Sequence, residues 1–220
     1  LTTYLGALPS TGREESWRDI GVAFPTEPTT FEVRQGLEPL AGVRLALFGD
    51  ATWNTRQRRR MNLLEDVLQL RLREVLREEQ GRTYGVSVAG SLTPYPRPRY
   101  RLNLSYSCDP EAVKETLDTL WTELRRLRAE GLPPELVEKA QSALLRERET
   151  RLKQNSFWLI ALRFYYRYGL DPQELLTYDD LVQSLSAEEL HQAAKDFLSE
   201  DRYLLGTLRP ADPPVTPLLP

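Results

Sequence analysis

The sequence is poor in the residues that build covalent or metal-bound frameworks. Its 220 residues include one cysteine, one histidine and one methionine. A single cysteine excludes an intramolecular disulfide and a CxxC pair, and a single histidine excludes a self-contained HxxEH or HExxH zinc centre. Apolar runs are short as well. The longest, from Phe157 to Leu162, falls far below the roughly 18 residues that a membrane span requires.

An excess of positive charge is also absent. The chain has 29 Lys and Arg against 32 Asp and Glu, a formal net charge of −3 at pH 7. Nucleic-acid affinity comes mostly from neutralising phosphates, so this balance argues against nucleic acid as a partner. The 40% hydrophobic residues indicate a folded chain that can bury a core of its own. Because it begins with Leu1 and has no signal-like segment, we expect a piece of a longer polypeptide.

Alternating apolar residues predict several short strands. Phe31–Arg34 and Val43–Phe48 are extended patterns, and alternation also marks residues 83–89 and 100–107. The last two patterns follow each other across a proline-rich loop, which predicts an antiparallel hairpin. A final strand pattern runs over residues 203–207.

Helical patterns occupy most of the remaining sequence. The longest runs from Asn54 to Glu79, with Gly81 placed as the left-handed residue that ends it. Asp109 begins another helix, and further helices follow up to the last strand. This order predicts an α+β domain in which an antiparallel sheet carries several helices on one face.

Proline and glycine divide the chain into three parts. Residues 1–30 are predicted to be a linker from a preceding domain, with short apolar stretches at residues 4–5 and 22–24 and one short strand. Residues 31–210 are predicted to form the folded domain, and residues 211–220 a proline-rich tail.

Arg77 and Tyr84 are the first candidate site. They flank the predicted corner between the long helix and the next strand, where a guanidinium and a phenol could both reach an extended peptide. The cation could bind a backbone carbonyl, and the phenol could donate to a carbonyl that becomes an oxyanion. A structural alternative remains open at this stage. Arg77 could interact with the helix dipole, and Tyr84 could share a core face with Val86 and Val88.

The segment from Asn62 to Asp66 has the spacing of HxxEH, with Asn and Asp in place of both histidines. Zinc favours nitrogen and sulfur donors that this set lacks. We therefore predict surface polar residues here and no metal site, and Glu65 is not expected to act as a general base.

Two further clusters have structural and functional interpretations. The basic run from Arg56 to Arg60 is interpreted as a solvated face, with a contact for an acidic partner as the alternative. The aromatic segment 157–168 could stack on RNA bases, but its helical spacing in an acidic chain favours core packing.

Taken together, four stretches resemble the pitrilysin/insulinase family of zinc metallopeptidases, in particular the last domain of its non-catalytic C-terminal half. The first, residues 76–86, contains an Arg followed seven residues later by a Tyr across a glycine turn. The others are residues 107–111, 131–140 and 155–159. The resemblance covers residues 31–209, most of the chain.

This resemblance implies a fold and a role. Family members have two similar halves that close over an extended peptide, and the first half holds zinc through HxxEH and a distant Glu. The second half supplies an Arg–Tyr pair, here Arg77 and Tyr84, which binds substrate backbone and stabilises the tetrahedral intermediate. An exposed sheet edge would add the peptide as a further strand. The chain would then bind no zinc itself, would be inactive alone, and would belong to a zinc endopeptidase.

The resemblance also implies partners. They are a catalytic half, on the same polypeptide or on a partner subunit, and a peptide substrate. The location would be the periplasm or cell envelope if the protein resembles bacterial two-half zinc proteases, and the cytoplasm otherwise. An enzymatically silent scaffold or partner subunit of the same fold is the alternative function.

Overall fold

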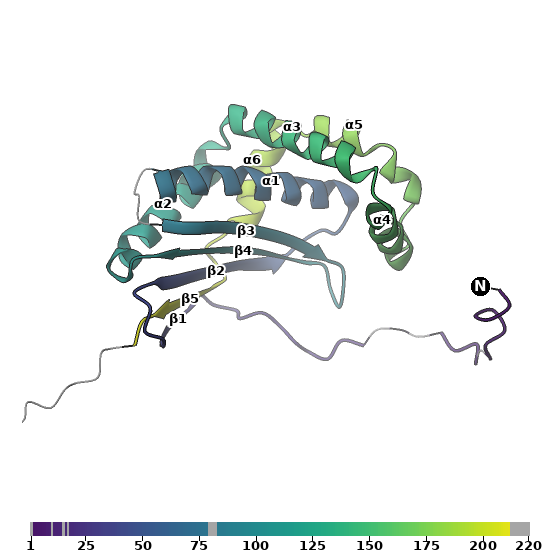
Figure 1. The fold of residues 1–220 in the computed structure, drawn as a ribbon, viewed down its shortest axis with the longest axis horizontal. Helices are drawn as coiled ribbons and strands as arrows, with labels where there is room; N and C mark the ends of the chain where they lie inside the picture. The colour runs from purple at the N-terminus through teal and green to yellow at the C-terminus, as the bar shows by residue number, and fades with distance from the viewer. Residues whose placement is uncertain (1, 10, 15, 17, 79–82, 212–220) are drawn as a thin grey trace, which may run out of the picture.

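The computed structural model describes residues 2–211 except residues 10, 15, 17 and 79–82. A five-stranded sheet of order β1-β5-β2-β4-β3 lies at its centre, and the helices lie on one side of that sheet (Figure 1). The strands are β1 (Thr29–Arg34), β2 (Ala41–Asp50), β3 (Thr83–Thr93), β4 (Arg99–Cys108) and β5 (Tyr203–Arg209). The α-helices are α1 (Thr55–Arg73), α2 (Val113–Glu130), α3 (Pro134–Arg151), α4 (Asn155–Tyr168), α5 (Tyr178–Gln183) and α6 (Ala187–Phe197). Short helical turns are η1 (Glu74–Glu78), η2 (Pro110–Ala112) and η3 (Pro172–Leu175).

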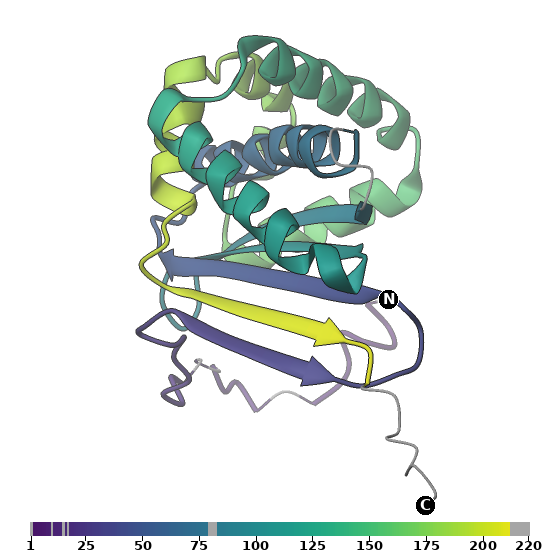
Figure 2. The ribbon, with the colours of Figure 1, turned by 90° about the vertical axis from the view of Figure 1, so that its left-hand side faces the viewer.

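The predicted α+β class is confirmed. Strands β2, β3, β4 and β5 pair in antiparallel fashion, including the predicted β3–β4 hairpin. The sheet is mixed, since β1 joins β5 in parallel at the far edge (Figure 2). The two strands lie at opposite ends of the domain sequence, so their orientation could not be inferred from a local turn.

The core lies between α1 and the sheet. Odd-numbered residues of β2 from Val43 to Leu47 point to the helices and are at most 1% exposed. Helix α1 presents its own apolar stripe to them, and α2 and α6 close the layer. Burial of these aliphatic side chains is the main stabilising contribution to the domain.

Helix α1 begins where the sequence predicts. The Oδ1 atom of Asn54 accepts the backbone N–H of Gln57 at 2.8 Å, which satisfies one of the free donors of the first turn. At its other end the helix does not stop but continues as the five-residue π-helical turn η1. The predicted terminating residue, Gly81, lies outside the described residues.

The segment before β1 differs from the prediction in one respect. Among the described residues before Thr29, the predicted short strand of the linker does not form. Instead Phe24 stacks on Phe48, with ring centroids 4.6 Å apart. Arg99 and Arg101 lie over the same ring. A large aromatic side chain thus covers Phe48, which would otherwise be exposed.

Helix α4 corrects the prediction of aromatic core packing. Only Tyr165 is buried, whereas Leu159 and Tyr166 are 71% and 74% exposed. The helix packs with one side only, because it lies at the end of the helical layer beyond the sheet (Figure 1). Within the described residues, no helix is both long and apolar enough to cross a membrane.

Candidate functional site

The corner between α1 and β3 carries both residues that the sequence singles out. The backbone of Arg77 lies in η1, and its side chain is outside what the structure describes. Tyr84 is the second residue of β3 and is 57% exposed. A tyrosine with this exposure is not a core residue of the chain, so the structural alternative for Tyr84 is wrong.

A β-bulge explains why Tyr84 points outward. The β3–β4 register shifts between Tyr84 and Ser87, and Gly85 adopts a φ of +62°. Such an extra residue reverses the alternation of the strand. After the bulge, Val88 faces the core, but before it the inward position belongs to Thr83, which is 2% exposed. The regular alternation that would have buried Tyr84 with Val86 and Val88 is therefore interrupted.

Strand β3 is an edge strand, but side chains of α1 cover part of its edge. The Nε2 group of Gln69 donates to the carbonyl of Val86 at 2.8 Å, and its Oε1 accepts from the N–H of Val88 at 2.9 Å. The Oε2 atom of Glu65 accepts from the N–H of Gly90 at 3.0 Å. A peptide strand would need these same backbone groups. The expectation of an open edge is therefore wrong for β3 between Val86 and Gly90.

A buried ion-pair network supports the helix end that precedes η1. Glu123 of α2 is 5% exposed and accepts from Arg71 of α1 at 2.7 Å and from Arg126 at 2.7 Å. Arg71 also binds Glu74, the first residue of η1, at 2.8 Å. These bonds connect α1, η1 and α2 and so hold the backbone on which Arg77 lies.

The HxxEH-like segment does not fit a zinc ion. No group of three or more His, Cys, Asp or Glu side chains is arranged to hold a metal within the described part of the chain. Glu65 is engaged with the backbone of Gly90, and Asn62 and Asp66 offer only oxygen and amide groups where zinc favours nitrogen or sulfur. Glu65 therefore joins α1 to β3 instead of activating water.

Asp66 gives a pH-dependent prediction. Burial, reinforced by repulsion from Glu65 and Glu147, raises the pKa of its carboxyl to about 6. A raised folded-state pKa means that ionisation destabilises the fold, so this cost develops between about pH 4 and pH 6. We expect Asp66→Asn to be more stable than the wild type at pH 7 by on the order of 1 kcal/mol, after allowance for partial exposure.

Urea unfolding at pH 7 and pH 4 tests this expectation. Most of the difference should be lost at pH 4, where Asp66 is protonated in the folded state and about half-protonated in the unfolded state. A constant difference between them across this range would show that the carboxyl does not titrate as described.

The family model for the peptidase M16 inactive domain matches residues 1–144, more than half of the 220 residues. The chain belongs to the peptidase M16 inactive-domain family. The predicted resemblance to pitrilysin- and insulinase-type proteases is confirmed by this match.

Among curated relatives of this M16 inactive domain is the probable zinc protease PqqL of Haemophilus influenzae. It is 27% identical over 190 residues, which cover 84% of this chain and 20% of the relative. The chloroplastic stromal processing peptidase of Arabidopsis thaliana is 29% identical over 141 residues, or 60% of this chain and 11% of the relative. The chain thus spans about a fifth or less of these relatives' length.

Solved structures share the fold of this M16 inactive domain. PqqL of Escherichia coli superposes with a TM-score of 0.73 at 22% identity and covers 84% of this chain and 21% of its own. The ferredoxin protease FusC, in complex with Arabidopsis ferredoxin, gives a TM-score of 0.78 at 17% identity. The match covers 95% of this chain and 23% of the FusC chain. A peptidase M16 inactive domain from Pseudomonas fluorescens gives a TM-score of 0.73 at 19% identity. The match covers 87% of this chain and 46% of the Pseudomonas chain.

Sequence reasoning missed two features of this corner. The π-helical turn η1 carries no helix-breaking residue that could have revealed it, although such turns are frequent at functional sites. The contacts of Gln69 with β3 were also missed, because a surface glutamine on a helix has no pattern that points to a strand edge. Gly85 beside Tyr84 was the one available signal, since glycine within a strand often marks a bulge.

Proposed function

We propose that this chain is a substrate-binding, non-catalytic part of a zinc-dependent endopeptidase that hydrolyses extended peptides or unfolded proteins. The zinc site would lie on the catalytic half, elsewhere in the same polypeptide or on a partner subunit. Tyr84 would donate a hydrogen bond to the substrate carbonyl as it becomes an oxyanion, and Arg77 would bind the peptide backbone. Hydrolysis itself would use the zinc-bound water of the other half.

The outward position of Tyr84 is the observation that carries this proposal. A phenol on an exposed strand start, displaced from the core by a bulge at Gly85, is free to face a neighbouring domain. One preorganised donor to an oxyanion is worth about 3–4 kcal/mol in a water-excluded site. Because side chains of α1 occupy the edge between Val86 and Gly90, the proposed peptide contacts are confined to the corner itself.

Relatives support a peptide-binding role. PqqL is named a probable zinc protease, and FusC, which shares this fold, is a ferredoxin protease whose structure contains ferredoxin. A domain of this fold therefore occurs in a protein that engages a protein ligand. We transfer only this general chemistry to the present chain, namely contact with an extended polypeptide.

Arg77→Ala tests the proposal in the complete polypeptide that contains this chain. A guanidinium that binds a backbone carbonyl contributes to substrate and transition state alike, so its loss should raise KM about tenfold and change kcat little. Arg73→Ala, an exposed arginine one turn earlier on α1, is the matched control and should leave both constants unchanged.

The kinetics of peptide hydrolysis also distinguish the proposed protease role from the alternative of an enzymatically silent scaffold. A complete polypeptide that lacks measurable hydrolysis but still assembles with its catalytic relative would be the silent scaffold. Unaltered KM and kcat in Arg77→Ala would remove Arg77 from the site.

A further inference from the structure

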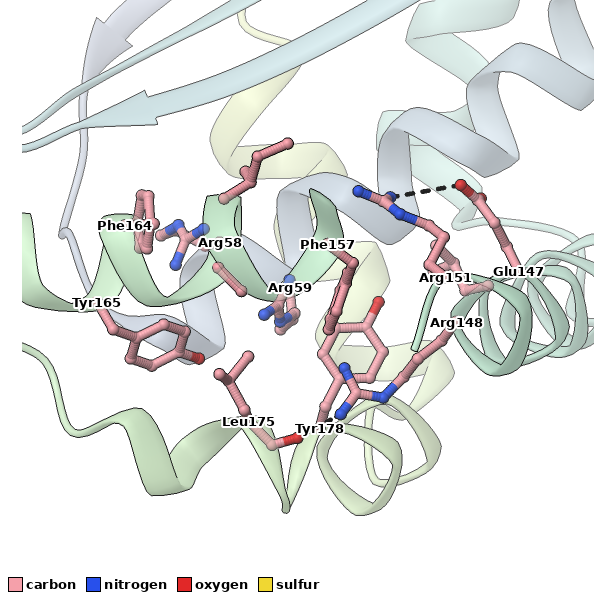
Figure 3. Close-up of a pocket in the computed structure, with 13 residues that line it drawn as sticks. Arg58, Arg59, Glu147, Arg148, Arg151, Phe157, Phe164, Tyr165, Leu175 and Tyr178 are labelled. Atoms are coloured by element: carbon pink, nitrogen blue, oxygen red, sulfur yellow. Dashed lines mark hydrogen bonds and ion pairs between the residues drawn. The ribbon is translucent and has the colours of Figure 1, made fainter. Parts of the chain in front are cut away.

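A pocket of about 230 Å³ lies at the opposite end of α1 from Tyr84. It is formed where the first turns of α1 meet α3, α4, η3 and α5 (Figure 3). Its lining combines apolar side chains with an unusual number of arginines. The cations are Arg58, Arg59, Arg148 and Arg151.

Two of these arginines have no anionic partner among the described residues. Arg148 pairs with Asp179 at 2.9 Å, and Arg151 pairs with Glu147 at 3.4 Å. The side chains of Arg58 and Arg59 form no ion pair and no hydrogen bond with any described residue, and each has a buried nitrogen, Nη1 and Nε respectively, without an acceptor. A buried donor without an acceptor carries a desolvation cost that a suitable ligand would relieve.

Aromatic rings hold these two guanidiniums in place. Arg58 lies over the ring of Phe164, 3.9 Å from its centroid, and Arg59 lies over Tyr178 at 4.3 Å. Stacking on a ring face fixes a guanidinium in a plane and leaves its N–H groups at the edge available. The prediction of a solvated basic face is therefore wrong for both residues.

A buried hydroxyl is directed at the same space. Tyr165 of α4 is 2% exposed, and its phenol oxygen has no hydrogen-bond partner among the described residues. Figure 3 shows the hydroxyl pointing into the pocket, toward Arg59 and Leu175. This donor belongs to another helix than Arg58 and Arg59, so it is an independent indication of a ligand.

The electrostatics at Arg58 favour an anion in this pocket. Burial, then the like charge of Arg59, lowers the pKa of its guanidinium to about 10. The groups that oppose this shift are Tyr165, Tyr168 and the carboxylate of Glu174. Glu174 is itself engaged by the hydroxyl of Thr55 at 2.6 Å and does not pair with Arg58. An added anion would therefore be attracted to this pocket.

We propose that this pocket binds a carboxylate carried beside an apolar side chain, as at the C-terminus of a peptide that ends in an apolar residue. The carboxylate would accept from Arg58, Arg59 and the hydroxyl of Tyr165, a donor set that matches its two oxygens. The apolar side chain would contact the rest of the lining, which includes Ile160 and Leu175.

This pocket is a separate site from the Tyr84 corner. Arg58 in α1 and Arg77 in η1 are 19 residues apart along continuous helical backbone, which corresponds to roughly 28 Å. The anion site does not depend on any role of Tyr84, whereas the choice of a peptide as carrier rests on the proposed function. Direct binding to the pocket is therefore the appropriate measurement. If Tyr84 proved to have no role in hydrolysis, the result of this binding experiment would not change.

The test is calorimetric titration of the chain with three short probes. They are acetyl-Ala-Ala-Phe with a free C-terminal carboxylate, the same peptide as its amide, and acetyl-Ala-Asp-Phe amide. We expect the free acid to bind at least about tenfold more tightly than the first amide, since hydrogen bonds to a charged group are lost in the latter. If the Asp peptide bound as tightly as the free acid, the carboxylate that the pocket recognises would be a side-chain carboxylate and not the C-terminal one.

Two variants localise the binding. Arg58→Met should weaken the acid about tenfold or more, and Tyr165→Phe should weaken it by a similar factor through the loss of one atom. Without probe, neither should lower the melting temperature appreciably, because the buried nitrogen and hydroxyl that are removed have no hydrogen-bond partner among the described residues and Met can keep contact with Phe164. Arg163→Met, an exposed arginine on α4 outside the pocket, is the control and should bind normally.

Several results would overturn the inference. Among them are equal affinity of the acid and both amides, no heat for any probe at millimolar concentration, and weakening by Arg163→Met equal to that by Arg58→Met. Competition of the acid by inorganic phosphate at equal concentration would also contradict it, because a site for any anion needs no apolar group.

Discussion

Replacing Tyr84 with Phe in the complete polypeptide is expected to lower kcat for peptide hydrolysis by about 100-fold or more. The change removes one phenolic oxygen and keeps the ring. An interaction made only with the oxyanion lowers kcat and kcat/KM together and leaves KM nearly unchanged. The measurement is steady-state hydrolysis of a fluorogenic peptide by the wild type and the variant.

The exposure of Tyr84 makes this experiment interpretable. The side chain is 57% exposed, so the variant should retain its stability within about 0.5 kcal/mol, as is usual for surface substitutions. Tyr166→Phe, at a tyrosine that is 74% exposed on α4, is the matched control and should leave kcat unchanged. Equal kcat values for Tyr84→Phe and the wild type would refute the oxyanion role.

Glu123→Gln is expected to give the largest loss of stability, about 2–3 kcal/mol at pH 7. The substitution keeps the shape of the side chain but removes the charge that Arg71 and Arg126 share. Two guanidiniums would then face each other without a carboxylate between them. Urea unfolding measures this effect, and Asp118→Asn, in the exposed pair with Lys114, should change stability by less than about 1 kcal/mol.

The pH dependence of this loss has a definite sign. Burial opposes ionisation of Glu123, but hydrogen bonds from Arg126 and Arg71 outweigh it and lower the pKa of the carboxyl. A lowered folded-state pKa contributes stability above the usual carboxyl pKa, and this contribution is lost as pH falls through the folded-state pKa. The difference between Glu123→Gln and the wild type should therefore shrink below about pH 4. A difference that stayed constant down to pH 2 would contradict the ion-pair explanation.

Asp66 and Glu123 show opposite consequences of burial. Both carboxylates lie in the helical layer, but Asp66 faces the acidic groups Glu65 and Glu147 whereas Glu123 lies between two arginines. Burial raises the pKa of Asp66 and the nearby carboxylates add to it, whereas at Glu123 hydrogen bonds from two arginines outweigh the effect of burial. The neighbours Glu65 and Arg126 lie on the same helices and are visible in the sequence, but burial, Glu147 on α3 and Arg71 on α1 come only from the tertiary structure.

Local chemistry made much of the fold predictable. The apolar spacing of α1 and the alternation of β2 and β4 involve residues a few positions apart, and their periods of 3.6 and 2 are visible in the sequence. Gly169, in left-handed conformation at the end of α4, has the same local origin. Elements defined by such short-range patterns were predicted close to their observed bounds.

The sequence by itself determined the α+β class, the order of helices and strands, and the placement of Arg77 and Tyr84 on either side of one corner. Only the tertiary structure decided which way Tyr84 points, that Gln69 covers part of the β3 edge, and that Arg58 and Arg59 line a pocket with Tyr165. The reason is physical: periodicity reports contacts within one helix or strand, whereas a bulge, a covered edge and an unpaired buried charge depend on partners far away in the chain.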